Sequence, residues 1–345
     1  MSAVAPASTV DQLAQALQPH PVLVHHDFSQ VPDFRLSSRN VLFVPDPRRT
    51  GWATFGFVEG IFHALRHAVE RLEFDYLQLL SPTCLPIKPM AAFEAHVAQG
   101  LDAHFGAIDL LADRECLMSV GYRAFTPEDT LRHRLLRRLC SEYFRDSTQR
   151  RDEHGVWIHG GGGGRWLAEL AYAVTRLASV PALARHPFGA GLPPYFGSVW
   201  FGARRHVVRS LVEGFAEPRL YAWASRLRIA EEFLVPSLLM RAARTRGPLN
   251  HYISRFDQAH PSRLDLTDLP VLRESPAFFA RKFPDDAQAP VRLRVLEELA
   301  APVPRERIEA VASGPLPAPL PSDDVSARQS ALRPLEPVPV LRAAG

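Results

Sequence analysis

Short apolar runs and one amphipathic segment follow each other near the amino end, and this succession constrains the fold more than any other feature. The runs at 21–27 (PVLVHHD) and 40–46 (NVLFVPD) are rich in β-branched residues and end in polar ones, as buried parallel strands do. From Phe55 to Leu72 apolar residues recur at helical spacing, and a third strand candidate follows at 74–80. The pattern predicts a β-α-β unit in an α/β domain, whose central sheet is mostly parallel with helices on both faces.

The ends of these strands supply the first candidate binding residues. Open parallel sheets bind ligands beyond the carboxyl ends of their strands, so Asp27, Asp46 and residues 81–88 are expected to border one crevice. Asp27 also has an ordinary explanation, because an aspartate after a strand is often a turn former.

Composition favours one large domain with a different carboxyl end. The chain has 345 residues, 46% of them hydrophobic, which suffices for a substantial core. We expect a domain over 1–300 and a disordered tail over 301–345, because 9 of the 31 prolines fall in the last 45 residues. The net charge of 40 − 37 = +3 is too small to indicate a general nucleic-acid partner.

Cysteine usage and hydropathy bear on the location of the protein. The three cysteines at 84, 116 and 140 are odd in number and widely spaced, which predicts neither a disulfide framework nor a zinc site. The amino end lacks the pattern of a secretory leader, and no run approaches the ~18 apolar residues of a membrane span. We therefore expect a cytoplasmic protein that is soluble, or at most peripheral at the inner face of the membrane.

Two helices and a glycine run occupy the middle of the chain. Residues 131–140 (LRHRLLRRLC) predict a basic amphipathic helix, and a second helix is expected from 165 to 177. The glycines at 160–164 precede the second helix, but no Lys-Ser/Thr follows them, so a flexible connection is favoured over a phosphate loop. A nucleic-acid site on the basic helix is a minor alternative.

Two neighbouring carboxylates, Glu231 and Glu232, are expected at the start of a helix. Pro236 is tolerated in a first helical turn, so the helix through 238–240 should begin close to Phe233. Acidic residues are common at helix N-termini, where the dipole favours them by ~0.3 to 1 kcal/mol, and this is the ordinary explanation for the pair.

Two cations lie among aromatic residues in the string Ser275–Phe283 (SPAFFARKF). An Arg281-Lys282 pair of this kind is often a surface pair whose stems cover apolar neighbours. No Asp-x-Asp, which many nucleotide-sugar transferases use to hold a divalent metal, occurs in the chain. The sequence predicts no metal ligands and no bound cofactor.

Five strings occur together in one order: FDYLQLLS and SPTCLPIK over 74–88, GSVWF over 197–201, EEF over 231–233, and SPAFFARKF over 275–283. In this order they resemble the core-2/I-branching β-1,6-N-acetylglucosaminyltransferase family (glycosyltransferase family 14), which includes the peptide O-xylosyltransferases. The separation of Trp200 from Glu232, 232 − 200 = 32 residues, also resembles the family pattern. The resemblance covers roughly residues 10 to 285.

The resemblance implies a GT-A-like nucleotide-diphosphate-sugar transferase fold and a role for each matched residue. Glu232 would be the catalytic base, and Arg281 and Lys282 would hold the diphosphate in place of a metal. Further implied contacts are Arg263 as a second donor cation, Asp27 at the uridine, and Trp200 and Glu231 at a sugar; Trp52 matches an aromatic position. Trp200 has a core-filling role as an equal alternative.

The implied activity is an inverting, metal-independent transfer of a sugar from a UDP-sugar to a glycan or lipid-linked saccharide acceptor. N-acetylglucosamine in a β-1,6 linkage is the first expectation, and xylose from UDP-xylose is the second. A rival of another class is a non-catalytic scaffold that binds a nucleotide or carbohydrate. A cell-envelope polysaccharide or lipid-linked glycan would suit as acceptor, with contacts expected between Asp109 and Arg138.

Overall fold

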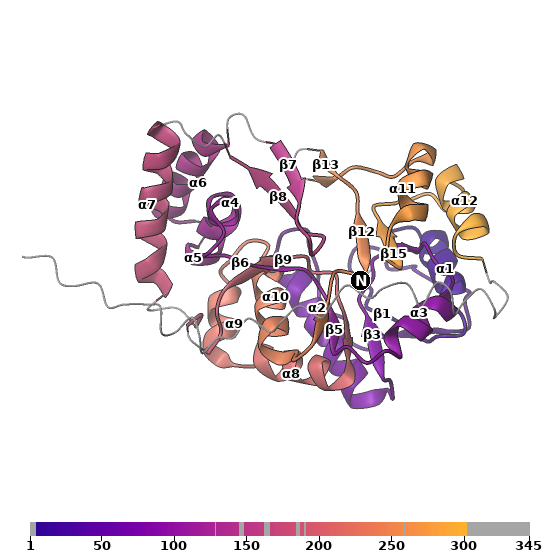
Figure 1. Cartoon of the computed structure of the whole chain (residues 1–345). Helices are drawn as coiled ribbons and strands as arrows, with labels where there is room; N and C mark the ends of the chain where they lie inside the picture. The colour runs from indigo at the N-terminus through magenta and orange to yellow at the C-terminus, as the bar shows by residue number, and fades with distance from the viewer. Residues whose placement is uncertain are drawn as a thin grey trace, which may run out of the picture.

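Helices and short strands alternate along the chain in a mixed α/β arrangement (Figure 1). The computed structural model describes residues 5–127, 129–144, 148–161, 166–183, 187–189, 191–257 and 260–301. The expected tail from 302 onward and Gly162 to Gly164 of the glycine run lie outside the described residues.

The described helices are α1 (Ala7–Ala16), α2 (Phe55–Arg71), α3 (Met90–Val97), α4 (Arg114–Cys116), the π-helix η1 (Leu117–Gly121), α5 (Tyr122–Phe125), α6 (Leu131–Tyr143), α7 (Trp166–Leu183), α8 (Arg205–Phe215), α9 (Pro218–Ala224), α10 (Glu231–Ala242), the 3₁₀ turn η2 (Leu266–Asp268), α11 (Leu269–Glu274) and α12 (Pro290–Glu298). The described strands are β1 (Val22–Val24), β2 (Val41–Phe43), β3 (Tyr76–Gln78), β4 (Leu85–Pro86), β5 (Ala103–His104), β6 (Ala107–Asp109), β7 (Thr148–Arg151), β8 (Trp157–Gly160), β9 (Tyr195–Gly197), β10 (Gly202–Arg204), β11 (Arg246–Gly247), β12 (His251–Ile253), β13 (Phe256–Asp257), β14 (His260–Pro261) and β15 (Phe279–Arg281).

The first strands and helix follow the sequence pattern closely. β1 and β2 pair in parallel, with Val22 opposite Val41 and Val24 opposite Phe43. α2 spans almost the whole periodic segment, and its buried residues include Val58, Ile61 and Leu65 at helical spacing. The basic helix and the helix after the glycine run are also present, as α6 and α7.

A mostly parallel central sheet is not present in the described residues, and this part of the prediction is corrected. The larger sheets are mixed: β11-β5-β10-β3 has one parallel and two antiparallel pairings, and β12-β15-β4 has one of each. β3 follows α2 directly but pairs antiparallel with β10, not with β1 or β2. Sequential neighbours therefore join different sheets, which strand composition alone cannot reveal.

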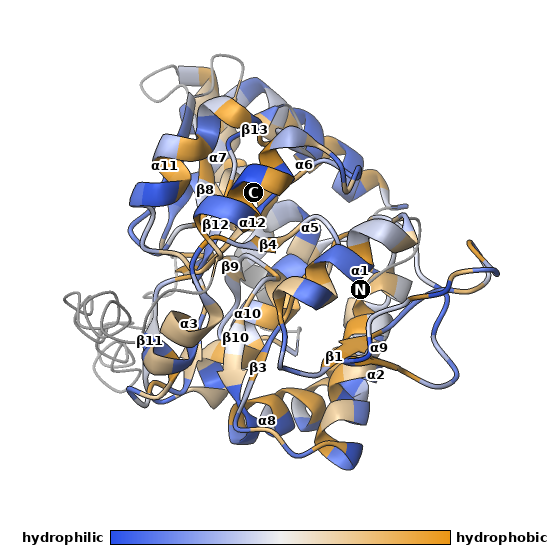
Figure 2. Ribbon diagram, turned by 90° about the vertical axis from the view of Figure 1, so that its right-hand side faces the viewer, coloured by the Kyte–Doolittle hydropathy of each residue, from blue (hydrophilic) through white to orange (hydrophobic). Residues whose placement is uncertain are grey.

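The main hydrophobic core lies where α2, α8 and α10 pack together around short strands. Phe62 and Phe215 stack in it at 4.0 Å between ring centroids, and Val207 and Leu238 are fully buried. A second core, centred on Phe279 and Phe283, joins α1, α11 and α12. Figure 2 shows hydrophobic and hydrophilic residues side by side along the helices, as expected for helices that each cover a core with one face.

Residues 110–194 form an insertion between two paired strands, β6 and β9. β6 and β9 pair antiparallel, with Ala107 opposite Gly197, and the chain between them contains α4 to α7 and the β7–β8 hairpin. Met118, Cys140 and Ala168 belong to a small hydrophobic core within this insertion. Figure 1 shows α4 to α7 at one end of the molecule and α1, α11 and α12 at the other, with the β7–β8 hairpin between them.

Candidate functional site

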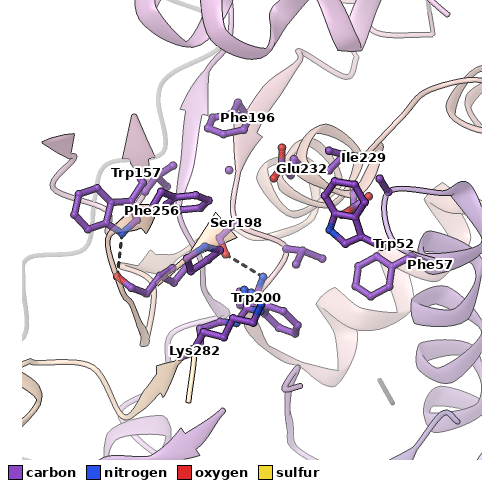
Figure 3. A pocket seen from close by; sticks show the side chains of 18 residues that line it. Trp52, Phe57, Trp157, Phe196, Ser198, Trp200, Ile229, Glu232, Phe256 and Lys282 are labelled. Atoms are coloured by element: carbon purple, nitrogen blue, oxygen red, sulfur yellow. Dashed lines mark hydrogen bonds between the residues drawn. The ribbon is translucent and has the colours of Figure 1, made fainter. Parts of the chain in front are cut away.

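A pocket of about 270 Å³ lies between α10, the β9–β10 connection, β8 and the end of β15. Its volume is just below the roughly 300 to 1,000 Å³ typical of small-molecule sites. The lining combines aromatic rings with two carboxylates and two cations: Trp52, Phe57, Trp157, Phe196, Trp200, Phe256, Glu231, Glu232, Arg281 and Lys282. In Figure 3 Glu232 and Trp52 lie on one side, away from Lys282 and Trp200.

The acidic side is built by the first turn of α10. The helix begins at Glu231, so both glutamates lie at its entrance as the sequence indicated. Pro236 lies inside the helix and not in its first turn, which corrects the expected start near Phe233. The buried residues Phe233 and Leu234 fix this turn in the main core.

Glu232 forms an ion pair with Arg123, which no sequence motif indicated. The distance from Arg123 Nη2 to Glu232 Oε2 is 2.9 Å, and the side chains are 14% and 32% exposed respectively. The Arg123 guanidinium also lies 5.5 Å from the centre of the Phe233 ring. Arg123 comes from the one-turn helix α5, too short for a periodic pattern, although it falls within the segment 109–138 where acceptor contacts were expected.

Glu231 is the buried member of the acidic pair. Burial, and next the negative charge of Glu232, raise the pKa of Glu231 to about 8. Its Oε2 atom has no hydrogen-bond partner among the described residues, although the residue lines the pocket. At neutral pH Glu231 is therefore a protonated carboxyl that can donate a hydrogen bond to a ligand.

The cationic side is formed at the end of β15. The Arg281 guanidinium lies 4.4 Å above the Trp200 ring, its side chain is partly buried with Nε enclosed, and burial lowers its pKa. Burial, and next the charge of Arg281, also lower the pKa of Lys282. The same cation adds to the burial that lowers the pKa of His251 to about 3.

In the part of the chain that the structure describes, the positive charge on this side is only weakly compensated, since Asp285 acts on Lys282 without forming an ion pair with it. Within the described ranges, no carboxylate forms an ion pair with Arg281 or Lys282, and Arg281 Nε has no hydrogen-bond partner. A buried charge without a counter-charge is costly, so a site of this kind favours an anionic ligand that supplies the missing charge. Two cations beside an open pocket suit the oxygens of a phosphate or pyrophosphate.

The aromatic residues divide between a buried and an exposed set. Trp200 is 5% exposed and holds Arg281 against its ring, which fits support of the cation better than stacking on a sugar. Trp52 is 66% exposed at the pocket edge, and the Arg228 guanidinium lies 5.3 Å from the centre of its ring. Trp157 is fixed by a hydrogen bond of 2.9 Å from its Nε1 to the Ile253 carbonyl.

Asp27 and Arg263 do not line the pocket. The Asp27 carboxylate accepts hydrogen bonds from Ser29, Gln30 and Thr50, including 2.6 Å from the Thr50 amide. Burial raises its pKa, but these hydrogen bonds outweigh burial and hold the pKa below the ordinary value. Arg263 forms an exposed ion pair of 2.9 Å with Asp285, although its charge still acts on Lys282.

The described part of the chain contains no metal-binding arrangement, that is, no group of three or more His, Cys, Asp or Glu side chains that could hold a metal ion. Asp46 and residues 81–88, expected at the crevice border, are also not among the pocket lining. The residues that the pocket does bring together from the sequence analysis are Glu231, Glu232, Trp200, Arg281 and Lys282, with Trp52.

Comparison with known proteins adds no family to these observations. No family model matches the chain, and no curated protein matches it. The pocket and its charges are therefore the basis for assigning a function.

Proposed function

We propose that the chain is an inverting, metal-independent glycosyltransferase of the core-2/I-branching type, with a GT-A-like fold and a UDP-sugar donor. One observation carries the proposal: two cations that form no ion pair with a carboxylate of the described residues, and a carboxylate at a helix start, line the same pocket. A sugar transfer from a nucleotide diphosphate needs both, one group for the leaving phosphate and another for the incoming hydroxyl. The mixed α/β architecture is compatible with this fold class.

In the proposed complex the pyrophosphate of the donor lies against Arg281 and Lys282. As the bond from the anomeric carbon to the phosphate oxygen breaks, UDP leaves with the bonding electrons and gains negative charge. The fixed cations stabilise that charge more in the transition state than in the ground state, which lowers the barrier. Trp200 keeps the Arg281 guanidinium in place, 4.4 Å from its ring.

The acceptor hydroxyl attacks the anomeric carbon from the face opposite to UDP, and Glu232 takes its proton. A new carbon–oxygen bond forms as the bond to UDP breaks, so the configuration at that carbon is inverted. A positioned general base of this kind contributes roughly 10² to 10⁴ in rate. Arg123 orients the Glu232 carboxylate through the 2.9 Å ion pair.

Aromatic and polar groups around the two charged sides suit a sugar ring. Trp52 is 66% exposed and, together with the nearby Arg228, can contact a sugar ring, and Glu231 can donate a hydrogen bond to a sugar hydroxyl or carbonyl. N-acetylglucosamine in a β-1,6 linkage is our first choice of sugar and xylose the second. The proposed acceptor is a glycan or lipid-linked saccharide.

A donor screen with chelator present tests the proposal. UDP-N-acetylglucosamine, UDP-xylose and other UDP-sugars are incubated with the protein in EDTA, and UDP release is measured with and without a mixture of glycan acceptors. We expect UDP to bind by calorimetry and one donor to release UDP in EDTA. Binding without release from any donor would favour the scaffold, and absence of UDP binding would contradict the nucleotide site.

A further inference from the structure

Helix α7 exposes a continuous apolar face. Trp166, Leu170, Val174 and Leu177 are 73%, 51%, 38% and 72% exposed. Their spacing of i, i+4, i+8 and i+11 places them along one side of the helix. The small residues on the opposite side, Ala168, Ala171 and Thr175, are buried. These four large apolar side chains therefore face away from the core, whereas Tyr172 of the same helix packs against it.

The neighbouring helix α6 adds positive charge and two further leucines. Arg132 donates a hydrogen bond to the Ala178 carbonyl of α7, so the two helices lie together. Arg134, Arg137 and Arg138 are exposed, as are Leu131 and Leu135 at 65% and 56%. The exposed acid of α7, Glu169, is ion-paired with Arg114 at 2.7 Å. The α6–α7 pair thus presents arginines beside tryptophan and leucine.

We propose that the α6–α7 pair binds the surface of a bilayer that contains anionic lipids. Amphipathic helices with Trp and Leu on one side and Arg nearby lie in the plane of the interface, where the apolar face enters the acyl boundary and the cations meet lipid phosphates. No helix in the described ranges is long and apolar enough to cross a membrane, so attachment is interfacial.

Charge complementarity favours this partner over the other two that an apolar face suggests. A second copy in a symmetric contact would bring the arginines of α6 against the same arginines. A nucleic acid would use the arginines but would leave the apolar side chains of α7 in water. An anionic bilayer uses both features at once. The inference does not rest on the proposed sugar transfer, because vesicle binding is measured without any substrate.

Sedimentation with vesicles tests the surface. Vesicles of phosphatidylglycerol and phosphatidylcholine are compared with vesicles of phosphatidylcholine alone, at low and high salt. The triple variant W166A/L170A/L177A should bind the anionic vesicles at least about tenfold more weakly than wild type. The charge variant R134E/R138E should lose binding at low salt. The matched controls, L266A/V271A/L293A and R209E/R219E, alter exposed residues on other helices and should bind like wild type.

A fluorescence measurement keeps the test decisive if a variant is poorly folded. Trp166 should shift its emission to the blue when anionic vesicles are added to wild type, and the conservative variant W166F should lack that shift. Failure of wild type to bind anionic vesicles, or equal loss of binding in the control variants, would overturn the proposal. A dimer in light scattering that the triple variant dissociates, without vesicle binding, would assign the face to a second copy and also overturn it.

Discussion

The two sides of the pocket handle charge in opposite ways. On the α10 side, Glu232 is neutralised by Arg123, and its neighbour Glu231 holds a proton at neutral pH because burial raises its pKa to about 8. On the β15 side, Arg281 and Lys282 have no ion-pair partner among the described residues. On the acidic side the charge is compensated within the free protein. On the cationic side the positive charge is compensated only when an anionic ligand binds.

This difference indicates which residues stabilise the free protein and which contribute mainly to ligand affinity. Removing one member of a matched pair leaves the other uncompensated, so stability falls. Removing an unmatched buried cation relieves a cost, so the free protein gains stability while ligand affinity falls. Each prediction below changes one of these charges and measures whether the two sides respond as they should.

Glu232→Gln should have the largest effect on transfer. The amide keeps the size of the side chain but cannot take the acceptor proton, so the rate should fall by roughly 10² to 10⁴. Affinity for UDP should stay close to wild type, because the cationic side is unchanged. UDP release and calorimetry measure the two quantities, and E213Q, an exposed change on α8, is the matched control. Equal loss of transfer and UDP affinity would point to a structural role for Glu232.

Arg281→Met should separate ligand affinity from stability. The apolar side chain keeps the contact with Trp200 but removes a cation, and each charge-assisted hydrogen bond lost costs about 1.5 to 3 kcal/mol, so UDP should bind roughly 10- to 100-fold more weakly. The free protein should be as stable as wild type or more so, since the cation has no ion-pair partner within the described ranges. Calorimetry and thermal unfolding provide the two readouts, with R209M on α8 as the control.

A variant that unfolds more easily and still binds UDP normally would contradict this prediction. Arg281 would then be a structural cation, held by its contact with the Trp200 ring.

Local periodicity predicted the helices but not how the strands combine. The apolar spacing from Phe55 to Leu72 identified α2 almost to the residue, and the β-branched runs identified the parallel pair β1–β2. The partners of β3 could not be inferred, because its strand partner β10 is more than a hundred residues away in the sequence. Several strands are also only two or three residues long, which leaves no room for a distinctive pattern.

In the site, too, residues in recognisable local motifs were predicted, whereas a contact between distant segments was not. The sequence indicated Glu232, Arg281, Lys282 and Trp200, and one pocket brings them together. Arg123 was missed, because its role depends on a one-turn helix that packs beside α10. Asp27 was indicated as a donor contact, but its carboxylate accepts hydrogen bonds from Ser29 and Gln30 of its own turn, in keeping with the turn-forming alternative, and from Thr50 of a neighbouring loop.

Arg123→Met should give an intermediate effect. Glu232 would remain partly buried without its partner, so stability should fall by roughly 1 to 2 kcal/mol, discounted for its partial exposure. Transfer should fall by about tenfold because the base is less well oriented. Arg123→Lys keeps the charge and should restore part of both losses, measured by thermal unfolding and by UDP release. Unchanged transfer in the methionine variant would show that the ion pair does not position the base.

Glu231→Gln should have the smallest effect near pH 5 and a growing effect on stability up to about pH 8. The folded protein holds the Glu231 proton until pH about 8, whereas the unfolded chain releases it near the ordinary value of 4.5. The unfolded state therefore binds fewer protons between these values, so the contribution of Glu231 to wild-type stability is highest below pH 4.5 and falls as pH rises toward 8. Glutamine does not titrate, so the variant should be the more stable protein at pH 9 and differ little at pH 5.

Thermal unfolding from pH 5 to 9 checks this, with E213Q as a control whose difference from wild type should not depend on pH. A pH-independent difference for E231Q would mean that Glu231 is ionised throughout. The acidic side would then carry two negative charges against one Arg123, and it would no longer be the matched side of the pocket. The contrast with Arg281 and Lys282 therefore depends on the proton of Glu231 as much as on the ion pair of Glu232.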